Sequence, residues 1–213
     1  MIEYKTLSLA DQVYDRLEQG ILSGVYPVGE VLSEKRLAAE LGVSRTPIRE
    51  ALSRLSYDNL IKDTPQGSEV LGISKDDVED MFLVKKKLEV IATVRAAANM
   101  GEAELSALQA VLDQQEYYSG KGDARKVRDL DTEFHDLIYA GSGSSTLQSI
   151  LSASHHKLMK FRRVSLENED RIMASVAEHR AIFEAMKSGD KKSVEDLMKA
   201  HIENAYDSIM GGM

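Results

Sequence analysis

Proline is confined to one end of this chain of 213 residues. The three prolines all lie in its first third, at Pro27, Pro47 and Pro65. Proline breaks the interior of a helix because it lacks the N–H donor and clashes with the preceding turn. The long stretch without proline therefore favours long helices, whereas the preceding part requires shorter elements and turns. We expect two domains, over residues 1–72 and residues 73–213.

The N-terminal part carries the pattern of three short helices. An amphipathic first helix is predicted by apolar residues at four-residue spacing, at Leu9, Val13, Leu17 and Ile21. Ser33 and Gly42 bracket a second helix over residues 34–41 as N-cap and C-terminal stop. Ser44 can cap a third helix over residues 45–57. The short gap between the second and third helices is typical of a helix-turn-helix.

Two strands and then a series of helices are predicted after the third helix. Residues 60–62 and 69–71 can pair around a turn at residues 64–67, which would form the wing of a winged helix-turn-helix. Beyond residue 74, helical periodicity interrupted mainly by glycine-containing turns predicts about six helices, over residues 75–100, 103–119, 123–140, 145–165, 169–187 and 190–210. We expect these to form an antiparallel helical bundle, so the predicted fold class is mostly α.

The charge of the chain argues against nucleic-acid binding by bulk electrostatics. The formal net charge is −8, and the first 72 residues hold 8 Lys and Arg against 11 Asp and Glu. The window over residues 35–54 is an exception, with five cations and only two carboxylates. Exposed charges more than about 10 Å apart are largely screened at physiological salt, so a local cluster of this kind can dominate at phosphate range.

The composition also restricts the chemistry and the setting. The chain contains no cysteine, which excludes disulfides and thiolate metal sites and leaves His, Asp and Glu as ligands. No segment approaches the ~20 consecutive apolar residues of a membrane span. The first residues lack the apolar core of a signal peptide. We expect a cytoplasmic protein that makes no contact with a membrane.

The string Val43-Ser44-Arg45-Thr46-Pro47-Ile48-Arg49-Glu50-Ala51-Leu52 carries the strongest functional signal. Arg45 and Arg49 share one face of the predicted third helix, while Ile48 and Leu52 face the domain. Arginine suits a DNA groove because its planar guanidinium can bind guanine O6 and N7 or clamp a phosphate. The spacing alone fits an ordinary solvated surface helix equally well.

Together with Ser33-Glu34-Lys35-Arg36-Leu37-Ala38 and Leu41-Gly42, this string resembles the DNA-binding domain of the GntR family of bacterial transcription regulators, over roughly residues 6–72. The resemblance implies a winged helix-turn-helix with DNA contacts at Lys35, Arg45, Thr46, Arg49 and Gly67. We also expect DNA contacts at Ser44 and at Arg36, which could reach a phosphate. Gly67 would bring the wing tip to the minor groove. Two positions depart from the family pattern, because Arg36 replaces a common Glu and Asp58-Asn59 replaces Glu-Gly. Asn tolerates positive φ second best after Gly, so we expect the turn to survive.

Four residues of the second domain are candidates for one metal site. Asp131 and His135, at i and i+4, project from one face of their helix. His179 and His201 lie on the apolar stripes of the last two helices, about 10.5 and about 11.5 residues from the centre of their hairpin, so at ~1.5 Å per residue their imidazoles lie at nearly the same height. Three imidazoles and one carboxylate suit Zn²⁺, Ni²⁺ or Mn²⁺.

The alternative is a set of core histidines that are hydrogen-bonded and bind no metal. Such satisfied histidines are common, and any one of the three inward imidazoles fits that description. His155 and His156 differ from them, because they are adjacent, so that at most one can face the core, and neither has an obvious partner.

The residues around these histidines resemble the FadR C-terminal domain (FCD) type of GntR regulator over about residues 75–210. The matching motifs are Asp131-x-x-Phe134-His135, Glu178-His179-x-x-Ile182 and His201-Ile202. The resemblance implies one divalent metal ion per chain, bound by Asp131, His135, His179 and His201 inside a helical bundle. The chain length and the number of helices are similar to the shorter VanR-like subgroup.

Three cationic residues are candidates for binding an effector, namely Lys85, Arg95 and Arg162. Lys85 stands in a segment that resembles the opening of the FCD domain, at a position where Arg is common, so a bidentate carboxylate clamp there is weakened. Arg95 lies on an apolar stripe and could reach a ligand or extend to solvent.

The sequence thus predicts a ligand-responsive DNA-binding transcription regulator, a repressor, that senses a small organic acid or sugar acid at a metal-containing pocket. We expect a homodimer on an inverted-repeat operator in double-stranded DNA. The alternative is a metal-dependent hydrolase with an Asp/His₃ site. Against that alternative, no His-Glu-x-x-His, Ser/His/Asp or Gly-rich phosphate motif is present. A helical scaffold with a structural metal would leave the first 72 residues unexplained.

Overall fold

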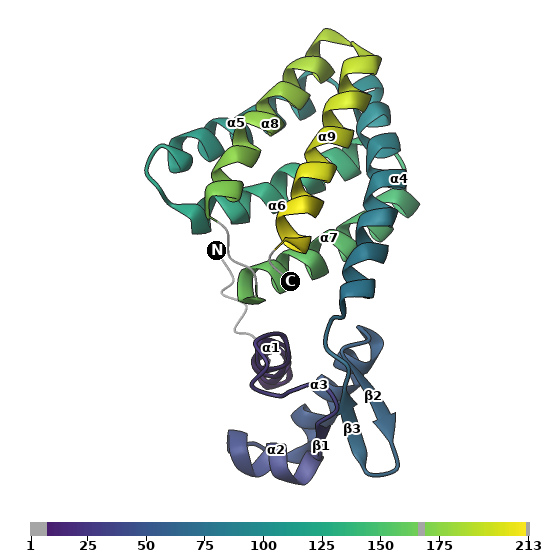
Figure 1. The fold of residues 1–213 in the computed structure, drawn as a ribbon, viewed down its shortest axis with the longest axis vertical. Coiled ribbons are helices and arrows are strands. Elements are labelled where there is room, and N and C mark those ends of the chain that lie inside the picture. The colour runs from purple at the N-terminus through teal and green to yellow at the C-terminus, as the bar shows by residue number, and fades with distance from the viewer. Residues whose placement is uncertain (1–7, 166–168, 212–213) are drawn as a thin grey trace, which may run out of the picture. The chain divides into compact units, whose positions relative to one another are not determined.

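The computed structural model describes residues 8–165 and 169–211, except for the side chains at 160–165, 169 and 172. The chain divides into two compact units, Met1–Ser74 and Lys75–Met213. Figure 1 shows the first as a small unit of helices and strands and the second as a helical bundle. The predicted fold class, mostly α with a winged helix-turn-helix before an antiparallel bundle, is confirmed.

Three helices of the first unit begin and end where local chemistry dictates. They are α1 (Leu9–Leu22), α2 (Glu34–Leu41) and α3 (Arg45–Tyr57). The Ser33 hydroxyl accepts from the backbone N–H of Arg36, and Gly42 ends α2 with a φ of 67°. These are the expected N-cap and left-handed C-cap. Ser44 occupies the N-cap position of α3, but its side chain makes no capping hydrogen bond.

A three-stranded antiparallel sheet completes this unit. The strands are β1 (Val31–Leu32), β2 (Ile61–Thr64) and β3 (Gly67–Val70), in the order β1-β3-β2. The predicted wing is confirmed as the β2–β3 hairpin. The two-residue strand β1 was not predicted, because it is too short to show the alternation of polar and apolar residues that marks a strand.

The core of the first unit explains why its helices pack together. Leu17, Leu37, Ile48 and Leu55 are fully buried, so α1, α2 and α3 each contribute to one apolar cluster. The turn after α3 places Asn59 at a φ of 55°. The expectation that asparagine would accept this left-handed conformation in place of glycine is confirmed.

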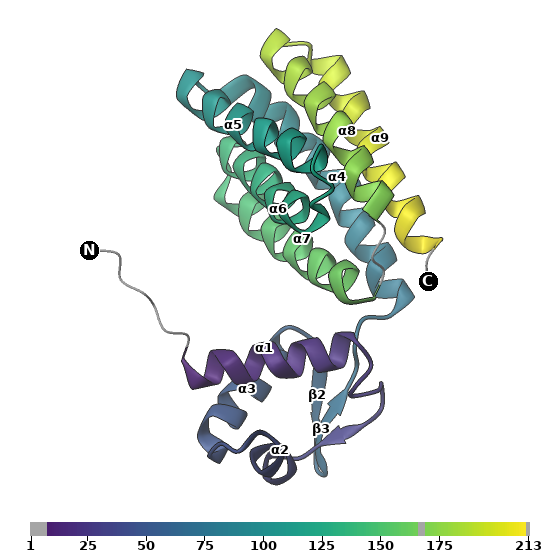
Figure 2. The same ribbon diagram turned by 90° about the vertical axis from the view of Figure 1, so that its left-hand side faces the viewer.

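Six helices of the second unit follow the predicted order, and every end lies within one residue of the prediction. They are α4 (Lys75–Asn99), α5 (Glu102–Ser119), α6 (Ala124–Gly141), α7 (Ser145–Ser165), α8 (Glu169–Ser188) and α9 (Lys191–Met210). Figure 2 shows α8 and α9 side by side as an antiparallel pair, with α5, α6 and α7 stacked in the other part of the bundle. Among the described residues, no helix is long and apolar enough to cross a membrane.

The core of the bundle combines apolar side chains with a buried polar cluster. Phe134, Phe183, Leu108 and Ile138 are essentially inaccessible. The same interior holds a set of buried polar or charged side chains, at Lys85, Glu89, Gln115, Asp131, His135, His155, His179 and His201. Such groups are rarely buried without partners, since an unpaired polar group in an apolar interior costs free energy.

The close approach of β1 and β3 generates a prediction about Gly67. A Cβ at this position would lie 2.5 Å from the Leu32 carbonyl oxygen, and the residue has a φ of 142°. We expect Gly67→Ala to open the β1–β3 pairing, as measured by faster hydrogen–deuterium exchange over residues 29–70 of the full chain. Gly24→Ala is the control, because Gly24 also has a positive φ (77°) but a Cβ there would meet no atom within 4 Å, so only backbone strain of about 1–2 kcal/mol applies. Equal exchange in the two variants would contradict the proposed clash.

Candidate metal centre and nucleic-acid interface

The N-terminal end of α3 exposes a polar face while its other face is buried. Ser44, Arg45, Thr46 and Arg49 are exposed, whereas the opposite face is buried at Pro47, Ile48, Ala51, Leu52 and Leu55. The buried residues anchor the helix in the domain. The exposed ones can therefore enter a groove without any change in packing.

Two arginines of this surface, Arg36 and Arg49, are held in exposed ion pairs. The Arg49 Nε and Nη2 atoms each lie 2.9 Å from a carboxylate oxygen of Glu34. Arg36 Nη2 lies 2.6 Å from Glu30 Oε1. Exposed pairs of this kind contribute about 0–1 kcal/mol, so a phosphate or a base edge can replace the carboxylate at little cost. Lys35 and Arg45 are exposed as well.

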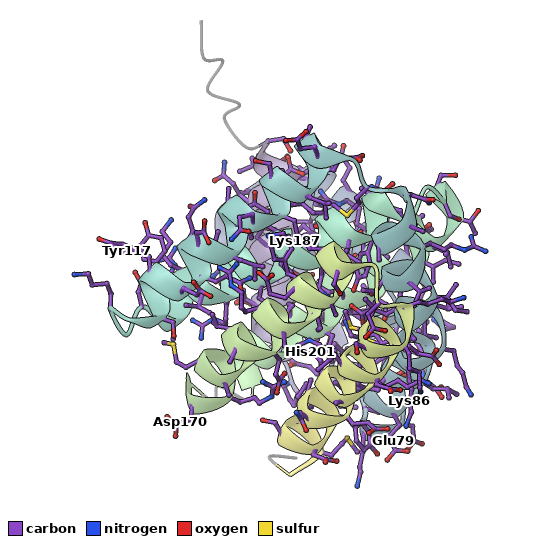
Figure 3. The ribbon with its side chains drawn as sticks, turned by 90° about the horizontal axis from the view of Figure 1, so that it is seen from above. Glu79, Lys86, Tyr117, Asp170, Lys187 and His201 are labelled. Carbon is purple, nitrogen blue, oxygen red and sulfur yellow. The ribbon has the colours of Figure 1, made fainter. Side chains whose placement is uncertain are left out.

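Three buried histidines from three helices converge in the bundle. His135 on α6, His179 on α8 and His201 on α9 each offer one nitrogen within 4.8 Å of the others. Their exposed fractions are 1%, 0% and 5%. Figure 3 labels His201 on α9, which packs against α8. The Asp131 carboxylate is adjacent, with Oδ1 at 3.7 Å from His179 Nε2. The structure thus brings the three predicted histidines together and places the fourth predicted residue, Asp131, next to His179.

Side chains around the cluster orient two of these imidazoles. His179 Nδ1 lies 2.9 Å from Gln115 Oε1, and Gln115 Nε2 donates to the Leu130 carbonyl at 2.9 Å. Since the Gln115 amide donates through its nitrogen, its oxygen must accept from His179 Nδ1–H. His201 Nδ1 donates in the same way to Glu178 Oε2 at 2.7 Å. Both rings therefore carry their proton on Nδ1 and their lone pair on Nε2.

The third imidazole also faces an acceptor. His135 Nδ1 lies 2.6 Å from Glu89 Oε1, although the approach is oblique and the contact is electrostatic rather than an ideal hydrogen bond. His179 Nε2 is buried and has no hydrogen-bond partner among the described residues. A histidine whose Nδ1 is bound to a carboxylate or amide, with Nε2 left over, has the arrangement of a metal ligand.

The electrostatics of the cluster favour the neutral form of His179 and His201. Burial lowers the pKa of His179 well below its ordinary value, and the neighbouring His201 and His135 lower it further. Burial also lowers the pKa of His201, against the opposing effect of the Glu178 hydrogen bond. Burial alone would raise the pKa of Glu89, but Lys85 and His135 hold it well below the ordinary range. Neutral imidazole is the form that binds a metal ion.

A fourth buried histidine, His155 on α7, adjoins the cluster. Its ring is 1% exposed, and Nδ1 lies 3.0 Å from the Lys85 ammonium. Its Nε2 is 3.6 Å from Asp131 Oδ2. Lys85 also pairs with Glu89 Oε2 at 2.9 Å and approaches the Tyr139 hydroxyl at 3.4 Å. The sequence indicated that one of two adjacent histidines could face the core but did not indicate which one or which partner.

A pocket opens beside these residues. It is lined by Phe82, Lys85, Arg128, Asp131, His135, His155, Leu158, Met159, Arg171, Ser175, His201, Ile202 and Ala205. Of the predicted effector contacts, Lys85 is in this lining. Arg95 is exposed and is not part of it, and the side chain of Arg162 lies outside the described residues.

Sequence reasoning missed the residues that orient the histidines. Glu89, Gln115 and Glu178 lie on three different helices and are far apart in the sequence. Of the three, only Glu89 has a local signal in the sequence, because it lies four positions after Lys85, a spacing that favours an ion pair on a helix. Glu178 immediately precedes His179 but binds His201 instead, because neighbouring residues on a helix point about 100° apart.

Comparisons with known proteins place both units in known families. The GntR family model, "Bacterial regulatory proteins, gntR family", matches residues 9–69, and the FCD domain model matches residues 80–204. The chain is 30% identical to the uncharacterised regulator YdhC of Bacillus subtilis, over 91% of this chain and 87% of that protein. It is 28% identical to the gluconate operon transcriptional repressor of Bacillus licheniformis, over 92% and 81%.

Two solved structures have the same fold. One, described as "Lar controls the expression of the Listeria monocytogenes agr system and mediates virulence", has a TM-score of 0.75 and 20% identity, covering 97% of this chain and 99% of its own. The other, Escherichia coli McbR/YncC, has a TM-score of 0.70 and 24% identity at the same coverage.

The low pKa values of the buried histidines predict a pH dependence of stability. Unfolded imidazoles take up protons near pH 6.5, while folded His155, His179 and His201 resist protonation. The unfolded chain therefore binds more protons, and the free energy of unfolding should fall as the pH drops below about 6.5, by up to about 1.4 kcal/mol per pH unit for each group. Urea titrations followed by circular dichroism, with a chelator present, measure this slope.

Two variants separate the contribution of the cluster from that of the other histidines. His179→Gln removes one titrating group and should make the slope shallower. His156→Gln is the control, since the His156 side chain is 47% exposed and outside the cluster. A free energy of unfolding that stays constant from pH 7.5 to pH 5.5 would refute the proposed role of burial.

Proposed function

The chain belongs to the GntR family of bacterial regulatory proteins and carries an FCD domain, and from that premise we propose that it is a transcriptional repressor that senses a small organic acid or sugar acid at a metal-containing pocket. The family consists of DNA-binding transcription regulators rather than enzymes, so the hydrolase alternative is abandoned. Several relatives are named as repressors, which supports repression rather than activation.

In this proposal residues 1–72 bind DNA. The contacts come from the exposed face of α2 and α3 and from the wing, namely Lys35, Arg36, Ser44, Arg45, Thr46, Arg49 and Gly67. The geometry supports Arg45 and Arg49 best, because they lie on the exposed face of a helix whose other face is buried. One such helix reads few base pairs, and a two-fold dimer on an inverted repeat doubles the contacts.

Residues 73–213 are proposed to bind the effector and to form the homodimer. Exposed apolar side chains support an interface on α4, where Leu83 is 57% and Ile91 is 45% exposed. Ile150, on the adjacent helix α7, is 44% exposed. Burial of such residues against a second copy of the chain would stabilise a dimer.

The proposed cofactor is one divalent ion per chain, Zn²⁺, Ni²⁺ or Mn²⁺, held by Asp131, His135, His179 and His201. The observation that carries this proposal is the buried His179 Nε2, which lacks a partner among the described residues while its Nδ1 is fixed by Gln115. A bound ion would supply open coordination positions as an anchor for a carboxylate. The name of the gluconate operon relative supports a sugar acid as the effector class.

The DNA-binding face is tested by Arg45→Ala and Arg49→Ala. Each should weaken binding to an operator selected in vitro by roughly 1–3 kcal/mol per half-site if the contact is to a base. Fluorescence anisotropy measures the affinity at fixed salt. Arg54→Ala is the control on the same helix, because Arg54 binds Asp11 at 2.6 Å and lies over the Tyr14 ring. If both test variants bind like the unmodified protein, α3 is not the recognition helix.

The metal site is tested by elemental analysis and by melting in the presence of a chelator. The protein should contain one divalent ion per chain and melt at a lower temperature once the ion is removed, because the ion binds the folded state preferentially. The His179→Ala variant should lose the ion while its first unit stays folded. The control variant His156→Ala should keep the ion, because His156 is exposed and lies outside the cluster. If the protein contains no metal, takes none up and melts at the same temperature with and without chelator, the metal proposal is wrong and the histidines are ordinary core residues.

A further inference from the structure

We propose that His155 is a positioning residue, which donates a hydrogen bond through Nε2–H to Asp131 and thereby orients that carboxylate toward the metal ion. This inference rests on the proposed metal site and adds to it a residue outside the predicted ligand set. It also assigns Lys85 a role other than binding the effector.

The tautomer of His155 follows from its contact with Lys85. The Lys85 ammonium has three N–H donors and no acceptor. It lies 3.0 Å from His155 Nδ1, which must therefore accept and cannot carry a proton. A neutral imidazole has one proton, so it must sit on Nε2. His179 and His201 have the opposite arrangement, with the proton on Nδ1 and the lone pair on Nε2.

This difference in tautomer separates ligands from donors within one cluster. A protonated ring nitrogen has no lone pair to offer to a metal ion. His155 therefore does not act as a ligand through Nε2, although its ring centroid is only 4.5 Å from that of His135. Its Nε2–H is buried and has no hydrogen-bond partner within standard geometry among the described residues.

The Asp131 carboxylate lies close to this donor. His155 Nε2 lies 3.6 Å from Asp131 Oδ2, while the other oxygen, Oδ1, lies 3.7 Å from His179 Nε2. The two oxygens thus face different neighbours, one a donor and one a metal-ligand nitrogen. A shift of a few tenths of an ångström closes the His155 contact to hydrogen-bond length. Ligating carboxylates are commonly held by such an outer hydrogen bond.

Lys85 is occupied by the protein itself. Its ammonium forms hydrogen bonds with His155 Nδ1 at 3.0 Å and the Tyr139 hydroxyl at 3.4 Å, and it forms an ion pair with Glu89 Oε2 at 2.9 Å. The ammonium is therefore committed to fixing the tautomer of His155 and to balancing the charge of Glu89. Its charge is balanced within the protein and does not require a carboxylate effector.

The first test measures the tautomer directly and needs no metal. Nitrogen-15 chemical shifts of the histidine side chains, recorded on the full chain in chelator, distinguish the protonated from the unprotonated ring nitrogen. We expect the proton on Nε2 for His155 and on Nδ1 for His179. A proton on Nδ1 of His155 overturns the proposal, whatever the fate of the metal site.

The second test compares two substitutions of similar size, of which only one retains an N–H donor. His155→Met removes the donor and should weaken Co²⁺ binding, measured by competition with a chromophoric chelator, by about 10–100-fold. His155→Gln places an amide N–H near the Nε2 position and should restore most of the affinity. His156→Met is the control on the same helix, and melting of the metal-free variants verifies that each one folds.

The outcomes separate the two proposals. If the unmodified protein binds no Co²⁺, the proposed metal site fails and this positioning role fails with it. If it binds Co²⁺ and His155→Met binds equally well, only the positioning role is overturned. If His155→Gln loses as much affinity as His155→Met and the Co²⁺ absorption spectrum shows the loss of a nitrogen ligand, His155 is itself a ligand and the proposal is wrong.

Discussion

The second unit depends on one constraint, the burial of charged groups and imidazoles in a mostly apolar interior. Lys85 and Glu89, one turn apart on α4, are 4% and 0% exposed and lie 2.9 Å apart. Removing either partner would leave an uncompensated buried charge, which costs several kcal/mol. Each member of the pair also contacts a histidine, since Glu89 contacts His135 and Lys85 contacts His155. The positions of two histidines are thus tied to the ion pair on α4.

The helices of this fold were predictable because their signals are local. Caps such as Ser33 and Gly42, and apolar residues at helical spacing, depend on neighbours within a few positions. Strand β1 was not predictable, because its two residues pair with β3 more than 30 positions away. Gly67 shows the same limit, since the reason for its lack of a side chain is the distant Leu32 carbonyl.

The residues of the candidate site also fall into two groups, those with a local sequence signal and those that depend on contacts between distant segments. Asp131, His135, His179 and His201 were identified because each lies on the inner stripe of an amphipathic helix and because their motifs resemble a known family. The groups that orient them, Gln115 and Glu178 among them, come from other helices or other faces, so they emerge only from the packing. The DNA-contact residues, the domain roles and the effector contacts stay predictions, for which exposure and pairing give support but no test.

The residue at position 85 illustrates how one substitution within a family pattern can change the chemistry of a site. Arginine, common at this position by resemblance, presents five N–H donors in a rigid plane suited to two oxygens of one carboxylate. Lysine presents a compact charge whose three donors can point in three directions, and here they meet a carboxylate, a hydroxyl and an imidazole on α4, α6 and α7. A planar guanidinium could not serve these three partners in the same space. The lysine therefore belongs with His155 as a matched pair, and the proposed orientation of Asp131 toward a metal ion depends on that pairing.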